Sequence, residues 1–315
     1  MVFTTRVPIG HYSIPIDYNS SVVSVGSCFA LNIGAKFEHF KFRNLTNPFG
    51  ILFHPLALEK FVSFAVNKKT FTEADIFFHE GRWHCFDAHS ELSDADPENL
   101  LRNLATAVKS ANAELTNASH LIITLGTAWV YRHTGSGNLV ANCHKIQQKE
   151  FTKELLGVQE IEQSIRSIMQ MVLTLNPDIN FIFTVSPVRH IKDGFAENQR
   201  SKAHLIAGLH EAIDSNDRAF YFPSYEIMMD ELRDYRFYAR DMIHPSQQAI
   251  DYIWERFADV CISPESKSLM AEIESIQKGL SHRPFNPDGE QHQKFLHALQ
   301  QKISTLREKY PHMVF

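Results

Sequence analysis

Cysteine is scarce in this sequence and thinly spread. The four cysteines are Cys28, Cys85, Cys143 and Cys261, and no two of them form a Cys-x-x-Cys pair. Small domains that depend on disulfides carry many closely spaced cysteines, so this pattern excludes a disulfide scaffold. We expect reduced thiols.

Long apolar runs and clusters of positive charge are also missing. No stretch approaches the roughly 20 apolar residues of a membrane-spanning helix, and residues 1–10 lack the charged-then-apolar order of a secretion signal. The 31 basic and 36 acidic residues include no Lys/Arg block. Nucleic acid is therefore not an expected partner, and we expect a cytoplasmic protein without a membrane span.

Short β-branched and aromatic runs, separated by segments with helical spacing, are abundant. Strands are predicted at residues 22–25, 121–125, 181–185 and 219–222, with a shorter one at 41–44. Helices are predicted at residues 30–40, 55–66, 97–112, 153–175, 196–213 and 247–260. The alternation predicts an α/β fold: a three-layer αβα sandwich around a mostly parallel, flavodoxin-like five-stranded sheet.

The C-terminal part has a purely helical pattern. We expect one domain over residues 1–262 and a C-terminal helical extension over residues 263–315. Two apolar stripes, at Leu269, Ile273, Ile276 and Leu280 and at Phe295, Leu299, Ile303 and Leu306, flank a break at 282–289 and predict a helical hairpin. The hairpin either packs on the domain or forms a homodimer interface.

A serine follows the first predicted strand. Gly26-Ser27 ends that strand and runs directly into helix-forming residues. Ligands of doubly wound sheets bind at the carboxyl ends of the strands, so Ser27 is a candidate nucleophile, with helix-terminal amides near it. Ser27 as a simple helix cap is the competing interpretation.

An Asp-x-x-His pair precedes the last helix of the predicted sandwich. In Asp241-Met242-Ile243-His244 the carboxylate can orient the imidazole, which can then act as a base toward Ser27. With 17 histidines in the chain, such a pair arises by accident about once. The Asp-x-x-His pair therefore supports a catalytic role only in combination with Ser27.

These residues lie in segments that resemble the GSCFA family, which is grouped with the SGNH (GDSL-like) hydrolases. Gly26-Ser27-Cys28-Phe29-Ala30 looks like the family's defining motif. Further segments that resemble the family read NPFGI at 47–51, TLGTAW at 124–129, ANCHK at 141–145, TVSPVRH at 184–190 and YARDMIHPS at 238–246. The resemblance covers about residues 4–260.

The resemblance implies a catalytic triad of Ser27, Asp241 and His244. It also implies an oxyanion hole built from the backbone N–H groups of Ser27 and Gly50. The superfamily's third block reads Gly-x-Asn-Asp, but here it reads Gly126-Thr127-Ala128-Trp129. Either Thr127 or Asn142 replaces the missing asparagine donor. An unreplaced donor would cost about 3 kcal/mol of transition-state stabilisation.

Further polar residues are predicted to border the substrate. Arg189, with Lys202 as a helper, is expected to bind a carboxylate or phosphate group, the alternative being a structural ion pair. Asn47, His144 and Lys145 are assigned to substrate binding as well.

A zinc site and a cysteine nucleophile are two further hypotheses, and both are less favoured. His79, His84, Cys85, Asp87 and His89 crowd together, but their spacing matches no standard zinc site, so we predict a surface β-hairpin around Glu80-Gly81 and no metal. Cys28 is a second candidate nucleophile, but a packing role is preferred.

Three functions follow as hypotheses. The first is a serine esterase that acts on a small-molecule or glycan ester through an acyl-enzyme, without a cofactor. The second is an acyltransferase of polysaccharide or envelope biosynthesis that uses an activated donor. The third is a ligand-binding protein without catalysis, for which Ser27 would react with no electrophile.

Overall fold

The alternating pattern folds into a parallel sheet of five strands. The computed structural model describes residues 4–214, 216–286 and 289–315. The sheet has the order β10-β9-β5-β1-β2, with β1 at Ser21–Gly26, β2 at Arg43–Thr46, β5 at His120–Leu125, β9 at Asn180–Val185 and β10 at Ala219–Tyr221. All neighbouring strands are parallel. This is the flavodoxin-like order, so the predicted fold class is confirmed.

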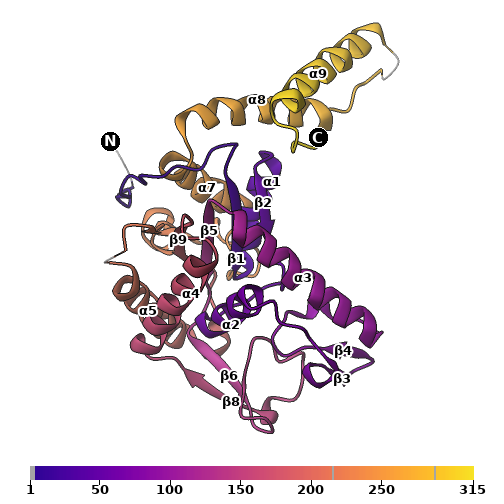
Figure 1. Ribbon diagram of the computed structural model, residues 1–315. Coiled ribbons are helices and arrows are strands. Elements are labelled where there is room, and N and C mark those ends of the chain that lie inside the picture. The colour runs from indigo at the N-terminus through magenta and orange to yellow at the C-terminus, as the bar shows by residue number, and fades with distance from the viewer. Residues whose placement is uncertain (1–3, 215, 287–288) are drawn as a thin grey trace.

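Helices cover both faces of this sheet, as Figure 1 shows. One face carries α2 (Pro55–Val66), α3 (Pro97–Asn117), α4 (Val158–Leu175) and α5 (Phe195–Ile213), and the other carries α1 (Cys28–His39) and α7 (Gln247–Cys261). The short α6 (Ser224–Glu226) follows β10.

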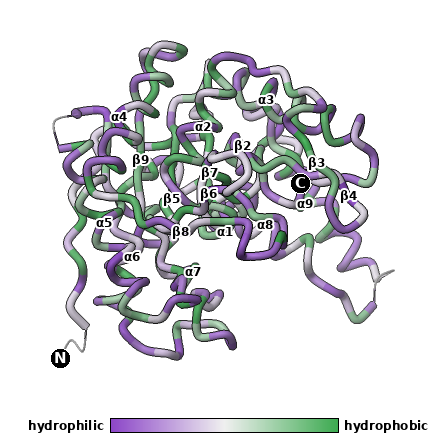
Figure 2. The backbone as a smooth tube through the Cα atoms, turned by 90° about the horizontal axis from the view of Figure 1, so that it is seen from below, coloured by the Kyte–Doolittle hydropathy of each residue, from purple (hydrophilic) through white to green (hydrophobic). Residues whose placement is uncertain are grey.

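Side-chain alternation along the strands creates two separate cores. Leu121, Ile123 and Leu125 of β5 pack in the core under α2 to α5, whereas Ile122 packs on the side of α1 and α7. In Figure 2 the central strands are largely hydrophobic and the surrounding helices alternate in hydropathy. This is the pattern of a sheet that is buried on both faces.

Two small antiparallel sheets are attached to the sandwich. The predicted hairpin around Glu80-Gly81 is confirmed as β3 (Phe77–His79) and β4 (Arg82–His84). A second sheet was not predicted. It consists of β7 (Leu139–Val140), β6 (Trp129–His133) and β8 (Phe151–Leu155). The helix expected from residue 153 therefore begins only at Val158, because Lys153 pairs with Tyr131 in this sheet.

The C-terminal hairpin consists of α8 (Pro264–Ser281) and α9 (Glu290–Lys309). Ile273, Ile276, Leu299, Ile303 and Leu306 are buried in the same core as α1 and α7. The outer members of both predicted stripes, Leu280 and Phe295, are exposed. The inner part of each stripe therefore packs on the domain within this chain.

The hairpin stands at the end of the sandwich opposite the carboxyl ends of the strands (Figure 1). α1 begins at the carboxyl end of β1 and ends at His39, whose Nε2 lies 2.6 Å from Glu274 Oε2 of α8. Across the described residues, no helix combines the length and apolar character needed to cross a membrane.

Candidate active site

The carboxyl ends of β1, β5 and β9 form one rim that carries Ser27, Gly126 and Ser186. Gly26 adopts φ +135°, and a Cβ atom on it would lie 2.1 Å from the Thr124 carbonyl oxygen. Glycine is therefore required where β1 closes against β5. Ser27 follows as the N-cap of α1, and its Oγ accepts a 3.4 Å hydrogen bond from Phe29 N–H. Its side chain is fully buried.

The Asp241–His244 pair is formed in the loop before α7. Asp241 Oδ2 lies 2.7 Å from His244 Nδ1, while Asp241 Oδ1 accepts hydrogen bonds from the N–H groups of Ile243 and His244 at 2.9 and 3.0 Å. These hydrogen bonds lower the pKa of Asp241 to about 2. The carboxylate is thus ionised and aligned with Nδ1, which leaves Nε2 of His244 as the basic nitrogen.

A backbone hydrogen bond ties this loop to the rim. Arg189 N–H, after β9, donates to the Ile243 carbonyl at 3.2 Å. His190, the next residue, is half-buried beside Phe53, and its pKa is lowered to about 3 by desolvation and by the charges of Lys202 and His244. Within the described residues, however, Ser27 and His244 share no hydrogen bond. The two predicted parts of the site are therefore not connected by a hydrogen bond in this conformation.

The two backbone donors predicted for the oxyanion hole are already in use. Ser27 N–H donates to the Thr124 carbonyl at 3.0 Å, and Gly50 N–H donates to the Asn47 carbonyl at 2.7 Å. Gly50 also faces His89, whose Cβ would lie 2.3 Å from an added Cβ. Each N–H group thus closes a turn or a strand end in this conformation, so the predicted oxyanion hole requires that both hydrogen bonds be exchanged for the substrate.

The two candidates for the missing asparagine donor lie beside one cavity. Thr127 Oγ1 lies 3.0 Å from Ser201 Oγ and accepts from Trp129 N–H, and Asn142 Oδ1 accepts from His144 N–H at 2.8 Å. Both residues line a cavity of about 270 Å³ next to the rim. Its other walls include Phe53, Trp129, Tyr131, Lys153 and His190. Sequence reasoning did not single out Trp129 and Tyr131, although Trp129 lies in the quoted segment 124–129.

The predicted substrate-binding residues separate into two groups. Asn47 Oδ1 accepts a hydrogen bond from Gly26 N–H at 2.8 Å. His144 is buried, its Nδ1 contacts Ser90 Oγ, and its Nε2 contacts the Cys85 carbonyl. In this conformation the side-chain oxygen of Asn47 and both ring nitrogens of His144 therefore have structural partners, whereas the buried Nδ2 of Asn47 has no hydrogen-bond partner among the described residues.

Arg189 and Lys145 remain available for binding. The Arg189 guanidinium lies 3.9 Å from the centre of the Tyr238 ring, and its buried Nη1 has no hydrogen-bond partner. Among the described residues Arg189 makes this cation–π contact and not the structural ion pair of the alternative interpretation. Lys145 is exposed.

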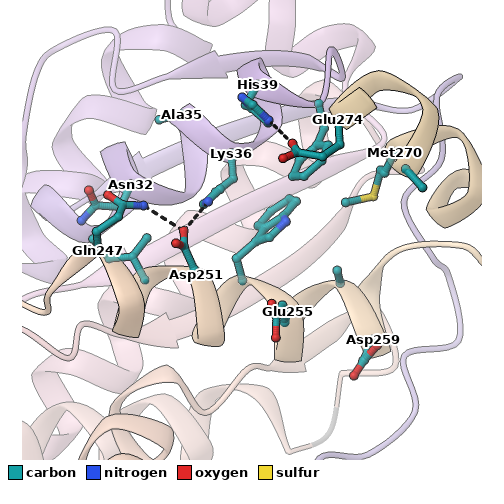
Figure 3. A pocket seen from close by; sticks show the side chains of 15 residues that line it. Asn32, Ala35, Lys36, His39, Gln247, Asp251, Glu255, Asp259, Met270 and Glu274 are labelled. Atoms are coloured by element: carbon teal, nitrogen blue, oxygen red, sulfur yellow. Dashed lines mark hydrogen bonds and ion pairs between the residues drawn. The ribbon is translucent and has the colours of Figure 1, made fainter. Parts of the chain in front are cut away.

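Titratable side chains also gather at two other places in the fold. Among the described residues, no three His, Cys, Asp or Glu side chains converge as metal ligands do. His84, in the histidine-rich hairpin, contacts Ser93 Oγ and the His79 carbonyl instead. A larger cavity of about 750 Å³ lies between α1, α7 and α8 (Figure 3). Its walls carry the Lys36–Asp251 and His39–Glu274 pairs.

Comparison with known families assigns the chain. Residues 21–257 match the model of the GSCFA family, and residues 273–315 match that of the GSCFA domain protein, C-terminal domain. A search of the curated proteins finds no match. The first model includes Ser27, Asp241, His244 and the whole parallel sheet. The chain belongs to the GSCFA family.

Proposed function

We propose that this chain is a serine ester hydrolase of the SGNH type, with Ser27 as nucleophile and Asp241–His244 as its base. The observation that carries the proposal is the Asp241–His244 pair. Its 2.7 Å contact and the two backbone donors on Asp241 fix the imidazole next to the segment that follows β9. An ordinary helix start needs no such pair, because Ser246 already caps α7.

The reaction proceeds by acyl transfer. His244 Nε2 takes the Ser27 proton while Oγ attacks the ester carbonyl, and the tetrahedral intermediate collapses when His244 returns that proton to the leaving alcohol. Water, activated in the same way, then releases the acid. Because Ser27 is fully buried and not hydrogen-bonded to His244, substrate binding must uncover Oγ and close the gap to Nε2.

The substrate proposed here is an O-acylated carbohydrate or a related small ester. The cavity beside the rim combines the rings of Trp129 and Tyr131 with the polar groups of Thr127 and Asn142. Aromatic rings and hydrogen-bonding groups together suit the apolar faces and hydroxyls of a sugar. Transfer of the acyl group to a sugar hydroxyl instead of water is the second candidate, because the same cavity can hold an acceptor.

The test is labelling with a fluorophosphonate, followed by mass spectrometry of the adduct. We expect labelling at Ser27 in the native protein, loss of the label in Ser27→Ala and much slower labelling in His244→Ala. Ser263→Ala is the matched control, since Ser263 caps α8 as Ser27 caps α1 but lies outside the rim. A label on Cys28, or none at all, contradicts the proposal.

Hydrolysis and transfer are separated by the products. With an acetylated sugar as donor, hydrolysis releases acetate at the same rate with and without an unacylated sugar acceptor. Transfer requires the acceptor and gives a new sugar ester.

A further inference from the structure

A lysine is buried at the rim. Lys202, on α5, is 1% exposed. Its Nζ donates hydrogen bonds to the carbonyl oxygens of Gly126 and Ser186, both at 2.7 Å. These residues directly follow β5 and β9, and a Cβ atom on Gly126 would lie 3.1 Å from Ser27 Cβ. The amine is thus bound to the residues of the rim, and one of them, Gly126, lies next to the proposed nucleophile Ser27.

No carboxylate neutralises this amine among the described residues. The titratable groups that face it are the Cys28 thiol at the start of α1, His190 after β9 and the ring of Tyr225 on α6, 5.6 Å away. A buried ammonium without a counter-ion is costly, and burial lowers the pKa of Lys202 to about 7. An anion that forms at the rim would meet an unpaired positive charge.

A purely structural role does not need the charge. A neutral amine has two hydrogens, which suffice for the carbonyls of Gly126 and Ser186. In contrast, the proposed reaction does need a positive electrostatic element, since the N–H groups of Ser27 and Gly50 are occupied and the third-block asparagine is absent. The charged and the neutral amine therefore predict different behaviour.

We propose that the protonated side chain of Lys202 is the buried cation that stabilises the oxyanion formed when Ser27 is acylated. This inference rests on the proposed function. During acylation the Ser27 Oγ–carbon bond forms and the carbonyl electron pair moves to oxygen. The Ser27 proton goes to His244 and then to the leaving alcohol. Lys202 gains and loses no proton, so it is a positioning residue that acts through its field and through the Gly126 carbonyl.

The test compares Lys202→Gln, which keeps N–H donors without charge, with Lys202→Met, which removes both. The rate of fluorophosphonate labelling at Ser27 is measured from pH 5 to 9. In the native protein the rate should fall above about pH 7 as Lys202 loses its proton. Both variants should label about 10- to 100-fold more slowly at pH 6 and should lack the fall above pH 7. If Lys202→Met does not fold, Lys202→Gln carries the test.

Cys28 provides a readout that does not depend on Ser27. Its thiol is less buried than Ser27, and the charge of Lys202 opposes the rise of the Cys28 pKa that burial causes. At pH 6, Lys202→Gln should slow alkylation of Cys28 by iodoacetamide several-fold. If Ser27 never labels but this slowing occurs, the esterase proposal fails and the rim cation stands.

Two outcomes overturn the inference. One is unchanged alkylation of Cys28 in Lys202→Gln, which identifies the amine as a neutral structural link. The other is Ser27 labelling in Lys202→Gln at the native rate with the fall above pH 7 retained.

Discussion

At the scale of single residues, Asp241 is the side chain with the most constrained chemistry in the site. Its two oxygens are held by three donors, and its pKa of about 2 keeps it ionised at any pH at which the protein would be assayed. An amide at this position would lose the charge and could present its N–H₂ to His244 Nδ1, which favours the wrong tautomer.

Asp241→Asn is therefore expected to slow Ser27 labelling by about 10³-fold or more while the protein stays folded. Asp251→Asn is the matched control: it also removes a partly exposed carboxylate, but one on α7 that pairs with Lys36 of α1. Equal labelling rates in the two variants would exclude Asp241 as the orienting group.

Three of the predicted site residues make structural hydrogen bonds that the sequence alone did not reveal. Asn47, Gly50 and His144 lie in segments that resemble the family, yet each hydrogen-bonds to the protein's own backbone. A polar residue near a site can hold the backbone or bind the substrate, and the same residue type at the same position in the sequence is compatible with both roles. Only the partners of each atom separate the two roles, and these partners are distant in the chain.

At the scale of elements, the junction between β1 and α1 is the least tolerant part of the fold. Gly26 combines φ +135° with a 2.1 Å approach of its missing Cβ to a backbone oxygen of β5, which cannot move aside as a side chain can.

Gly26→Ala is expected to destabilise the protein by about 3 kcal/mol or more, or to prevent folding. Gly10→Ala is the control, because no atom lies within 4 Å of its added Cβ. Urea unfolding of both proteins measures the difference. Similar midpoints would show that β1 and β5 separate easily.

The packing of α8 on the domain gives a second test at this scale. Ile273 is fully buried, whereas Leu280 on the same helix is 46% exposed. Ile273→Ala should cost about 2–5 kcal/mol through loss of apolar contacts and the cavity left behind, and Leu280→Ala much less. Urea midpoints that fall equally in both variants would contradict the burial of this stripe.

Elements were predictable where their signal was local. The helix at 55–66 and the central strands follow from apolar periodicity and from Pro55 at a helix start. β6 and β8 were missed because Trp129–His133 finds its partner about 20 residues later, and neither strand has clean alternation. Strand pairing between segments so far apart in the chain cannot be predicted from the local pattern of either segment.

At the scale of the whole molecule, buried neutral histidines make stability depend on pH. Burial lowers the pKa of His54 and of His144 to about 4. His54 Nδ1 accepts from Ala57 N–H, and Nε2 lies 3.1 Å from the Val140 carbonyl, so no position is left for a second proton. On unfolding, both imidazoles regain an ordinary pKa near 6.5 and take up protons.

The free energy of unfolding should therefore fall as the pH drops from about 6.5 to about 4, by roughly 3 kcal/mol for each of these two histidines. The sign follows because the unfolded chain binds more protons than the folded one in that window. Chemical unfolding at several pH values measures the slope, and His144→Gln should reduce it, whereas replacement of the exposed His11 should not. A flat profile would contradict neutral burial.

The three tryptophans lie in different regions of the molecule, so their fluorescence can report on each region separately. Trp83 lies in the β3–β4 hairpin and Trp129 in the wall of the cavity beside the rim. Trp254 lies on α7, stacked on Phe40 in the cavity between α1, α7 and α8. Each region thus carries its own native fluorophore. With the other two tryptophans replaced by phenylalanine, emission from Trp129 reports occupation of the cavity, and emission from Trp254 reports docking of the C-terminal hairpin. Ligand binding at one end and helix release at the other can then be followed separately in the same chain.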